Sequence, residues 1–175
     1  MSAWSTMPSE AFLRERLRLR HRANRFRGFS GFVGADLLTV ASIFPLLMHE
    51  PVEIREASPE INCYAHAAGV SQWMQCDCGN SFWPEGVTRS VRWQAYAEAF
   101  QALGFRIAAQ PVAGRETVAL YADKFGICSH AARHLNGHRW ESKLGANPWV
   151  LTGHSLQSFE CRYGQVSCYL QRKSA

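Results

Sequence analysis

The chain has 175 residues and a formal net charge of +5, and 47% of its residues are hydrophobic. This length accommodates one ordinary domain with an extension, and the apolar content excludes a disordered chain. Residues 14–27 hold seven arginines and one glutamate, a local charge of +6, so the remaining residues carry about −1. The positive charge therefore belongs to an N-terminal arm, which argues against a domain that itself reads nucleic acid.

The N-terminal arm is expected to cover residues 1–50 and to be helical, first basic and then apolar. Residues 9–27 predict a basic helix, whose positive face is formed by Arg14, Arg16, Arg18, Arg20 and Arg22. Such a face is compatible with binding to an acidic membrane surface or to nucleic acid, and also with simple solvation.

A mostly apolar stretch follows at residues 29–48, and three interpretations of it stay open. It is a signal anchor or interfacial membrane segment, an apolar segment at 35–47 that packs on the main domain, or part of an arm outside the functional protein. Asp36 near the centre of a membrane span would cost about 2.5–3.5 kcal/mol, which favours the two interpretations that do not span. Residues 51–60 are expected to form a linker or an edge segment.

Residues 61–172 predict the main domain, an α+β fold of two helices followed by an antiparallel sheet of four to five strands. Asn62 can cap a helix over Cys63–Trp73, and Ser90 can cap a second helix over Val91–Leu103. The expected strands are Phe105–Val112, Thr117–Ala122, Ile127–Leu135, His138–Leu144 and Tyr163–Gln171, with an Asn136-Gly137 hairpin turn between the third and the fourth.

Cys63 is the strongest candidate for a catalytic nucleophile. It begins a predicted helix, where unpaired backbone N–H groups and the helix dipole favour a thiolate. His130, on the strand before the hairpin, is the candidate proton acceptor and donor, and Glu141 is the candidate residue that orients its imidazole. Asn147 and His154 are weaker candidates for that third position. The alternative for Cys63 is a small thiol packed in a core.

Three further residues are expected to line the same site or to contribute to an oxyanion hole, namely Asn62, His66 and Lys143. His66 lies one helical turn after Cys63, so the two share a helix face. Arg133, Arg139 and Lys143 surround the hairpin, where they either bind an acidic group or cover an exposed sheet face.

The six cysteines are Cys63, Cys76, Cys78, Cys128, Cys161 and Cys168. No secretory signal is visible, so their even number does not argue for disulfides, and we expect a reducing, cytoplasmic compartment. Secretion as an effector and membrane association through residues 29–48 are the alternatives. The C-x-C and C-x6-C spacings match zinc sites poorly and no glycine-rich phosphate loop is present, so neither a metal nor a cofactor is predicted.

Four short motifs resemble those of an uncharacterised bacterial domain family. They are NCYAHA at residues 62–67, VALYA at 118–122, HAARHL at 130–135 and WESKLG at 140–145. More distantly, the domain is similar to papain-like amidases and peptidases of the CHAP and NlpC types. That resemblance implies a papain-like small domain with Cys63 and His130 as catalytic residues. The chain departs from the family in its Cys76–Gly79 loop and in the arginine-rich arm.

These residues together predict a cysteine-dependent hydrolase or acyl transferase acting on an amide or ester bond. Its substrate would be a peptide or a small amide or ester, and a bacterial effector or toxin is one setting for such a peptidase or amidase. The alternative is a non-enzymatic protein-interaction domain whose basic arm binds a membrane surface, nucleic acid or a partner protein.

Overall fold

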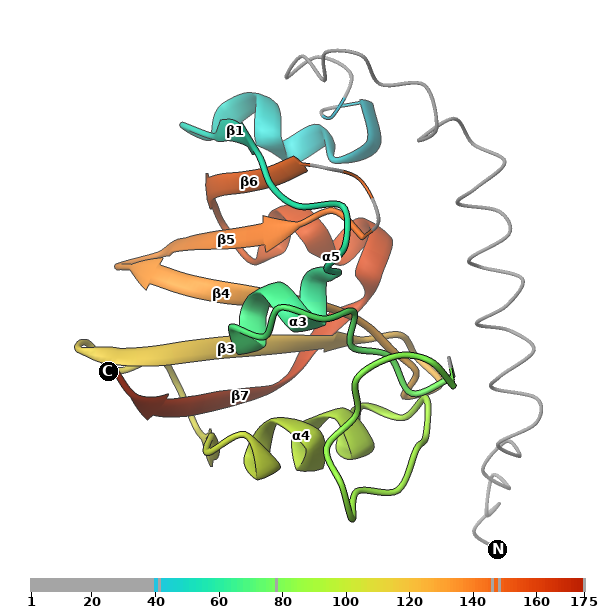
Figure 1. Cartoon of the computed structure of the whole chain (residues 1–175). Coiled ribbons are helices and arrows are strands. Elements are labelled where there is room, and N and C mark those ends of the chain that lie inside the picture. Colours follow the sequence, from blue (N-terminus) through green and yellow to red (C-terminus); the bar gives the residue numbers. More distant parts are fainter. Residues whose placement is uncertain (1–39, 41, 78, 146, 148, 175) are drawn as a thin grey trace, which may run out of the picture.

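The structure is a computed structural model that describes residues 40, 42–77, 79–145, 147 and 149–174. The predicted basic helix with its arginines, and Cys78, lie outside these residues. Within them, the chain forms three α-helices and a seven-stranded antiparallel sheet (Figure 1). The predicted α+β class is confirmed, although the sheet has more strands than the four or five expected.

The strands follow one another across the sheet in the order β1-β6-β5-β4-β3-β7-β2. Their bounds are β1 (Glu53–Glu56), β2 (Arg106–Ala108), β3 (Arg115–Ala122), β4 (Cys128–Asn136), β5 (Arg139–Lys143), β6 (Trp149–His154) and β7 (Gln165–Lys173). Four of the expected strands correspond closely to β3, β4, β5 and β7, whereas the strand expected at Phe105–Val112 shrinks to the three residues of β2. The sheet also contains β6, which was not expected, and β1, which lies in the segment expected to be a linker or an edge segment.

The helix α3 (Cys63–Ala68) begins where the sequence predicts it. The side chain of Asn62 accepts a hydrogen bond from the backbone N–H of Ala65 at 3.0 Å, as an N-cap should. The helix is shorter than expected because Gly69 adopts a left-handed conformation with φ 72°, which ends it after one and a half turns. This short helix fixes the direction in which the predicted nucleophile points.

Each face of the sheet is covered by helices and carries its own core (Figure 1). One face, the α3 face, is covered by α3 and α4 (Trp93–Ala102). The other, the α5 face, is covered by α5 (Gln157–Tyr163) and the 3-10 helix η2 (Pro45–His49). The core of the α3 face includes Tyr96, Phe100 and Leu120, and the core of the α5 face includes Phe44, Tyr121 and Phe159.

Part of the expected N-terminal arm packs into the domain. Val40, Phe44 and Leu47 are each at most 2% exposed and belong to the core of the α5 face. For the described part of the stretch 29–48, the structure therefore shows packing on the main domain. No helix among the described residues is long and apolar enough to cross a membrane.

The expected linker is also part of the fold. Its residues 53–56 form the edge strand β1, which pairs antiparallel with β6. Just before it, the carboxylate of Glu50 accepts hydrogen bonds from the backbone N–H of Ser155 at 2.9 Å and the hydroxyl of Ser158 at 2.7 Å. The folded unit therefore starts well before residue 61, the boundary expected from the sequence.

Candidate functional site

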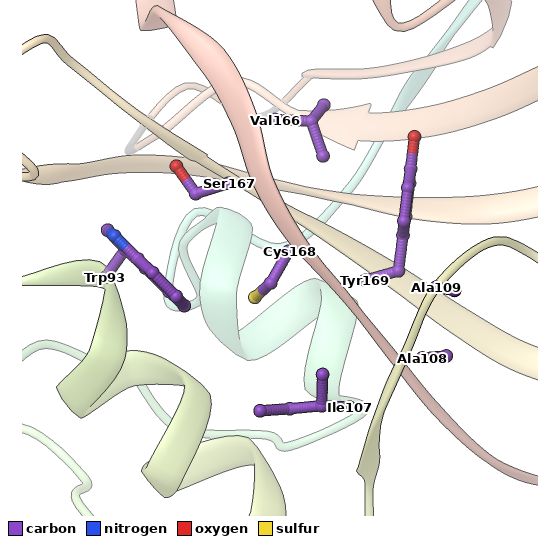
Figure 2. Close-up of a pocket in the computed structure, with 8 residues that line it drawn as sticks. All are labelled: Trp93, Ile107, Ala108, Ala109, Val166, Ser167, Cys168 and Tyr169. Atoms are coloured by element: carbon purple, nitrogen blue, oxygen red, sulfur yellow. The ribbon is translucent and has the colours of Figure 1, made fainter.

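A cavity of about 360 Å³ lies at the β2–β7 edge of the sheet (Figure 2), but none of the predicted site residues lines it. Those residues lie elsewhere, over the middle of the sheet. The α3 face brings together five of the six, namely Asn62, Cys63, His66, Glu141 and Lys143. The sixth, His130, lies on the α5 face.

The predicted pairing of Cys63 with His130 is absent from the structure. The imidazole of His130 stacks on Tyr163 with ring centroids 4.2 Å apart, and its Nε2 is 2.9 Å from the hydroxyl oxygen of Ser142. Both partners belong to the α5 side of the sheet, whereas Cys63 packs in the core of the α3 face. Burial lowers the pKa of His130 well below its usual value, so this imidazole is a neutral core group.

A register shift in the β4–β5 hairpin explains why the sequence misleads at this point. An Asn136-Gly137 turn without a bulge would place His130 on the face of Lys143, but Leu135 is an extra residue in β4, since His134 pairs with Trp140 and Asn136 with Arg139. The extra residue turns His130 to the opposite face. A second bulge, in the pairing of β4 with β3, makes Ser129 an extra residue and separates Cys128 from His130. The Ser129 hydroxyl donates to the backbone carbonyls of Tyr121 and Tyr163, which holds the bulge in place.

Cys63 is a buried thiol with 6% of its surface exposed. Burial raises its pKa to about 11, although the backbone N–H of Ala131 and the positive charge of Lys143 act in the opposite direction. Less than a thousandth of such a thiol is ionised at neutral pH. The position at a helix start therefore does not by itself make Cys63 a reactive thiolate.

Lys143 is the charged group that acts on the Cys63 thiol. Its side chain is fully buried, and its Nζ donates hydrogen bonds to the carbonyls of Gly145 at 2.8 Å and Asn147 at 2.6 Å. Burial lowers its pKa to about 8. Lys143 thus fixes the turn after β5, and its ammonium group is occupied by backbone carbonyls.

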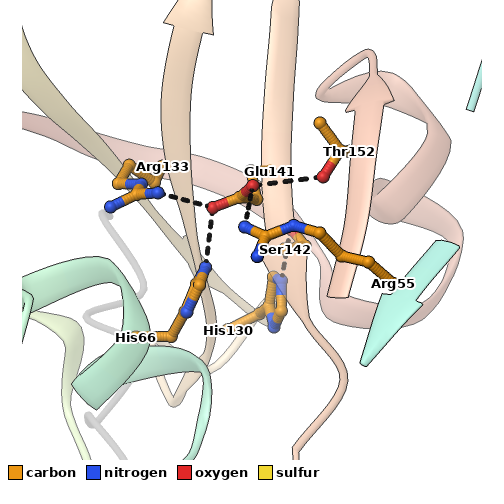
Figure 3. A network of polar contacts seen from close by, with 7 residues as sticks. All are labelled: Arg55, His66, His130, Arg133, Glu141, Ser142 and Thr152. Carbon is orange, nitrogen blue, oxygen red and sulfur yellow. Dashed lines mark hydrogen bonds and ion pairs between the residues drawn. The ribbon is translucent and has the colours of Figure 1, made fainter. Parts of the chain in front are cut away.

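Glu141 is the centre of the polar network on the α3 face (Figure 3). Its carboxylate, 3% exposed, contacts the Nη2 of Arg55 at 2.5 Å, the Nη2 of Arg133 at 2.7 Å and the Nε2 of His66 at 2.9 Å. The hydroxyl of Thr152 donates to it at 3.1 Å. Five separate elements, β1, α3, β4, β5 and β6, therefore meet at one carboxylate.

The carboxylate of Glu141 is held in its ionised form. Burial alone would raise its pKa, but the hydrogen bonds from His66 and Arg55 and the charge of Arg133 outweigh burial and hold the pKa well below its usual value. Glu141 was expected to orient His130, and the structure pairs it with His66 instead. Its two arginines remain partly open to solvent, with 52% of the Arg55 side chain and 39% of the Arg133 side chain exposed.

Sequence reasoning missed Arg55 and Thr152 as members of this site. Arg55 lies 86 residues before Glu141 in the chain, on a strand in the segment that was expected to be a linker or an edge segment. Val52 and Ile54 alternate with Glu53 and Arg55 and pack against the core of the α5 face, but an alternation over four residues is too short to mark β1 as part of the sheet. Among the described residues, no cluster of three or more His, Cys, Asp or Glu could hold a metal ion.

A protein-family model described as "Domain of unknown function (DUF7689)" matches residues 53–171. The chain belongs to this family. The DUF7689 match runs from β1 into β7 and so spans the whole sheet. No curated protein and no solved structure matches the chain. The expected membership of an uncharacterised domain family is thereby confirmed, whereas the expected papain-like similarity finds no support in these comparisons.

Proposed function

We propose that this DUF7689 domain is a binding domain that recognises an acidic group of a partner through Arg55 and Arg133. The observation that carries the proposal is the Glu141 network, in which one buried carboxylate holds Arg55 of the edge strand β1 and Arg133 of the inner strand β4. Arginine recognises carboxylates and phosphates through several N–H donors in a fixed plane.

The two arginines keep unused donors. Each guanidinium contacts Glu141 through Nη2 only, and the described residues contain no other hydrogen-bond partner for the remaining N–H groups of Arg55 or Arg133. The one carboxylate also balances only one of the two guanidinium charges, so Glu141, Arg55 and Arg133 together keep a net charge of +1. Both features favour an incoming anion.

Glu141 supports this role by holding the arginines before a ligand arrives. A long side chain loses conformational freedom on binding, and a side chain already fixed by an ion pair loses less. The middle of the polar cluster is therefore ordered, while its outer donors stay accessible to a partner.

Binding of a small acidic probe tests the proposal. The probe is a blocked pentapeptide of alternating glycine and glutamate, titrated into the full chain by calorimetry at low and moderate salt. We expect Arg55→Gln and Arg133→Gln each to weaken binding about tenfold, equivalent to about 1.4 kcal/mol, and we expect salt to weaken binding of the native chain. Arg139→Gln, at the exposed hairpin, is the matched control. Equal losses in all three variants would refute the proposal.

A cysteine-dependent hydrolase or acyl transferase remains the second candidate, because one observation favours it. His66 bonds Glu141 and lies one turn after Cys63 on the helix α3. A candidate base, with a carboxylate that orients it, therefore lies on the same face of the helix as the Cys63 thiol. In that mechanism, Cys63 attacks the carbonyl carbon, His66 passes the thiol proton to the leaving group, and water later releases the acyl group.

The two candidate functions predict different rates of Cys63 alkylation. Alkylation of Cys63 would be measured against pH for the native chain, for His66→Gln and for His138→Gln, an exposed control. The hydrolase requires a Cys63 rate that exceeds that of an ordinary thiol at pH 7 and falls specifically in His66→Gln. The binding domain requires slow alkylation that neither substitution changes.

A further inference from the structure

The outer edge of β7 is only partly covered by another strand. On its inner side β7 pairs with β3 from Gln165 to Lys173, but on its outer side β2 pairs only with Tyr169, Leu170 and Gln171. The residues 165–168 have no strand beside them on that side. Ser167 is moreover an extra residue in the pairing with β3, so it has no partner on the inner strand either.

The chain leaves the sheet after β2 and so does not cover residues 165–168. If β2 continued beyond Ala108 it would run beside 165–168, but Pro111 has no N–H group and cannot take part in such a ladder. The side chain of Gln171 also donates a hydrogen bond to the carbonyl of Gln110 at 2.7 Å, which holds the departing chain. The open position is thus a fixed feature of the edge.

The cavity of about 360 Å³ lies at this open position (Figure 2). It is lined by Trp93, Ile107, Ala108, Ala109, Val166, Ser167, Cys168 and Tyr169, none of which is charged. Cys168 packs against the core of the α3 face, whereas Val166 and Tyr169 pack against that of the α5 face. The cavity therefore offers apolar contacts on both sides of an uncovered strand.

We propose that this edge binds an extended, uncharged peptide segment of a partner protein as an additional strand beside β7. Unpaired main-chain groups are satisfied by another extended main chain, and the alternating side chains of that strand would reach the two apolar sides of the edge in turn. The uncharged lining favours an uncharged segment, since it offers no partner for a charged side chain. This site lies at the end of the sheet opposite β1 and is independent of the arginine cluster.

The test uses the full chain, labelled with nitrogen-15, and a blocked six-residue peptide of alternating valine and threonine as the probe. We expect the amide signals of residues 165–168 to shift on titration. A second peptide, N-methylated at alternate residues, keeps the side chains but lacks the N–H donors that a strand needs. It should bind at least tenfold more weakly.

A matched pair of variants places the contact. Ile107→Lys changes an apolar residue of the cavity wall that is 59% exposed, and Val112→Lys changes one that is 46% exposed and lies outside the cavity. Both changes are at the surface, so both variants should fold. Loss of peptide binding in Ile107→Lys alone supports the proposal. Equal binding of the N-methylated peptide, or equal loss in the two variants, overturns it.

A second copy of the chain is the competing occupant of this edge. Sedimentation of the native chain and of Ile107→Lys at micromolar concentrations would separate the two cases. A dimer that Ile107→Lys dissociates would overturn the peptide proposal, and a monomer in both cases agrees with it.

Discussion

Replacing Glu141 with glutamine tests whether its charge holds the polar cluster together. The carboxylate accepts hydrogen bonds from four side chains, whereas an amide oxygen can accept about two. Two charge-assisted bonds are therefore lost. Because the arginines are half exposed and regain water, each loss counts as about 1 kcal/mol, and Glu141→Gln should destabilise the fold by about 2 kcal/mol at pH 7. The melting temperature should fall by about 4–8 °C.

The cost of this substitution should depend on pH. The folded pKa of Glu141 lies well below its usual value, and the pKa in the unfolded chain is about 4.3. The carboxylate therefore stabilises the fold fully above pH 4.3, and the stabilisation is lost as pH falls towards the folded pKa. The loss is about 1.4 kcal/mol per pH unit, so about half of the difference between the native chain and Glu141→Gln should remain at pH 3.5.

Urea unfolding followed by circular dichroism at pH 7, 5, 4 and 3.5 measures this difference. Glu56→Gln, on the same strand as Arg55 but exposed, is the control and should stay within about 0.5 kcal/mol of the native chain. A difference for Glu141→Gln that is the same at pH 7 and pH 3.5 would show that the ionised carboxylate does not stabilise the cluster.

Three further predictions concern buried groups. Burial lowers the pKa of His154 to about 4. Unfolding therefore takes up a proton between about pH 6.5 and 4, and the fold loses stability as pH falls through that range. His154→Phe should reduce the slope of unfolding free energy against pH by about 1.4 kcal/mol per pH unit. With iodoacetamide at pH 8, exposed Cys161 should react about a hundredfold faster than Cys63, as mass spectrometry of the peptides would show. Gly164→Ala would place a Cβ 2.1 Å from the carbonyl oxygen of Ala122 at φ 83°, and urea unfolding should report a loss of about 3 kcal/mol or more.

Local signals in the sequence predicted the parts of the fold that depend on local interactions. Asn62 caps α3 and Gly137 closes the β4–β5 hairpin because short-range geometry decides both. By contrast, β1 and β6 depend on distant partners, since β1 pairs with β6 and β6 pairs with β5. The helix α5 has only seven residues, and it is stabilised by the packing of Phe159 in the core of the α5 face.

The candidate site was predicted in part for the same reason. Cys63, His66 and Glu141 were expected together, and the structure places them on one face; the one-turn spacing of Cys63 and His66 is readable from the sequence. The face on which His130 lies relative to Glu141 depends on one extra residue in the hairpin, Leu135. A bulge of this kind has no signature in a single sequence, so the predicted Cys–His pairing could not be checked before the structure was known.

The contacts of Glu50 and β1 with β6 and α5 have a consequence for synthesis on the ribosome. Glu50 contacts a serine 108 residues later, and β1 pairs with β6, which emerges almost a hundred residues after it. Until then, Phe44 and Leu47 have no core to enter. Such distant contacts form slowly and leave apolar surface open to aggregation. The first of the described segments to be translated is thus among the last to be buried, and its apolar side chains stay exposed until α5 has left the exit tunnel.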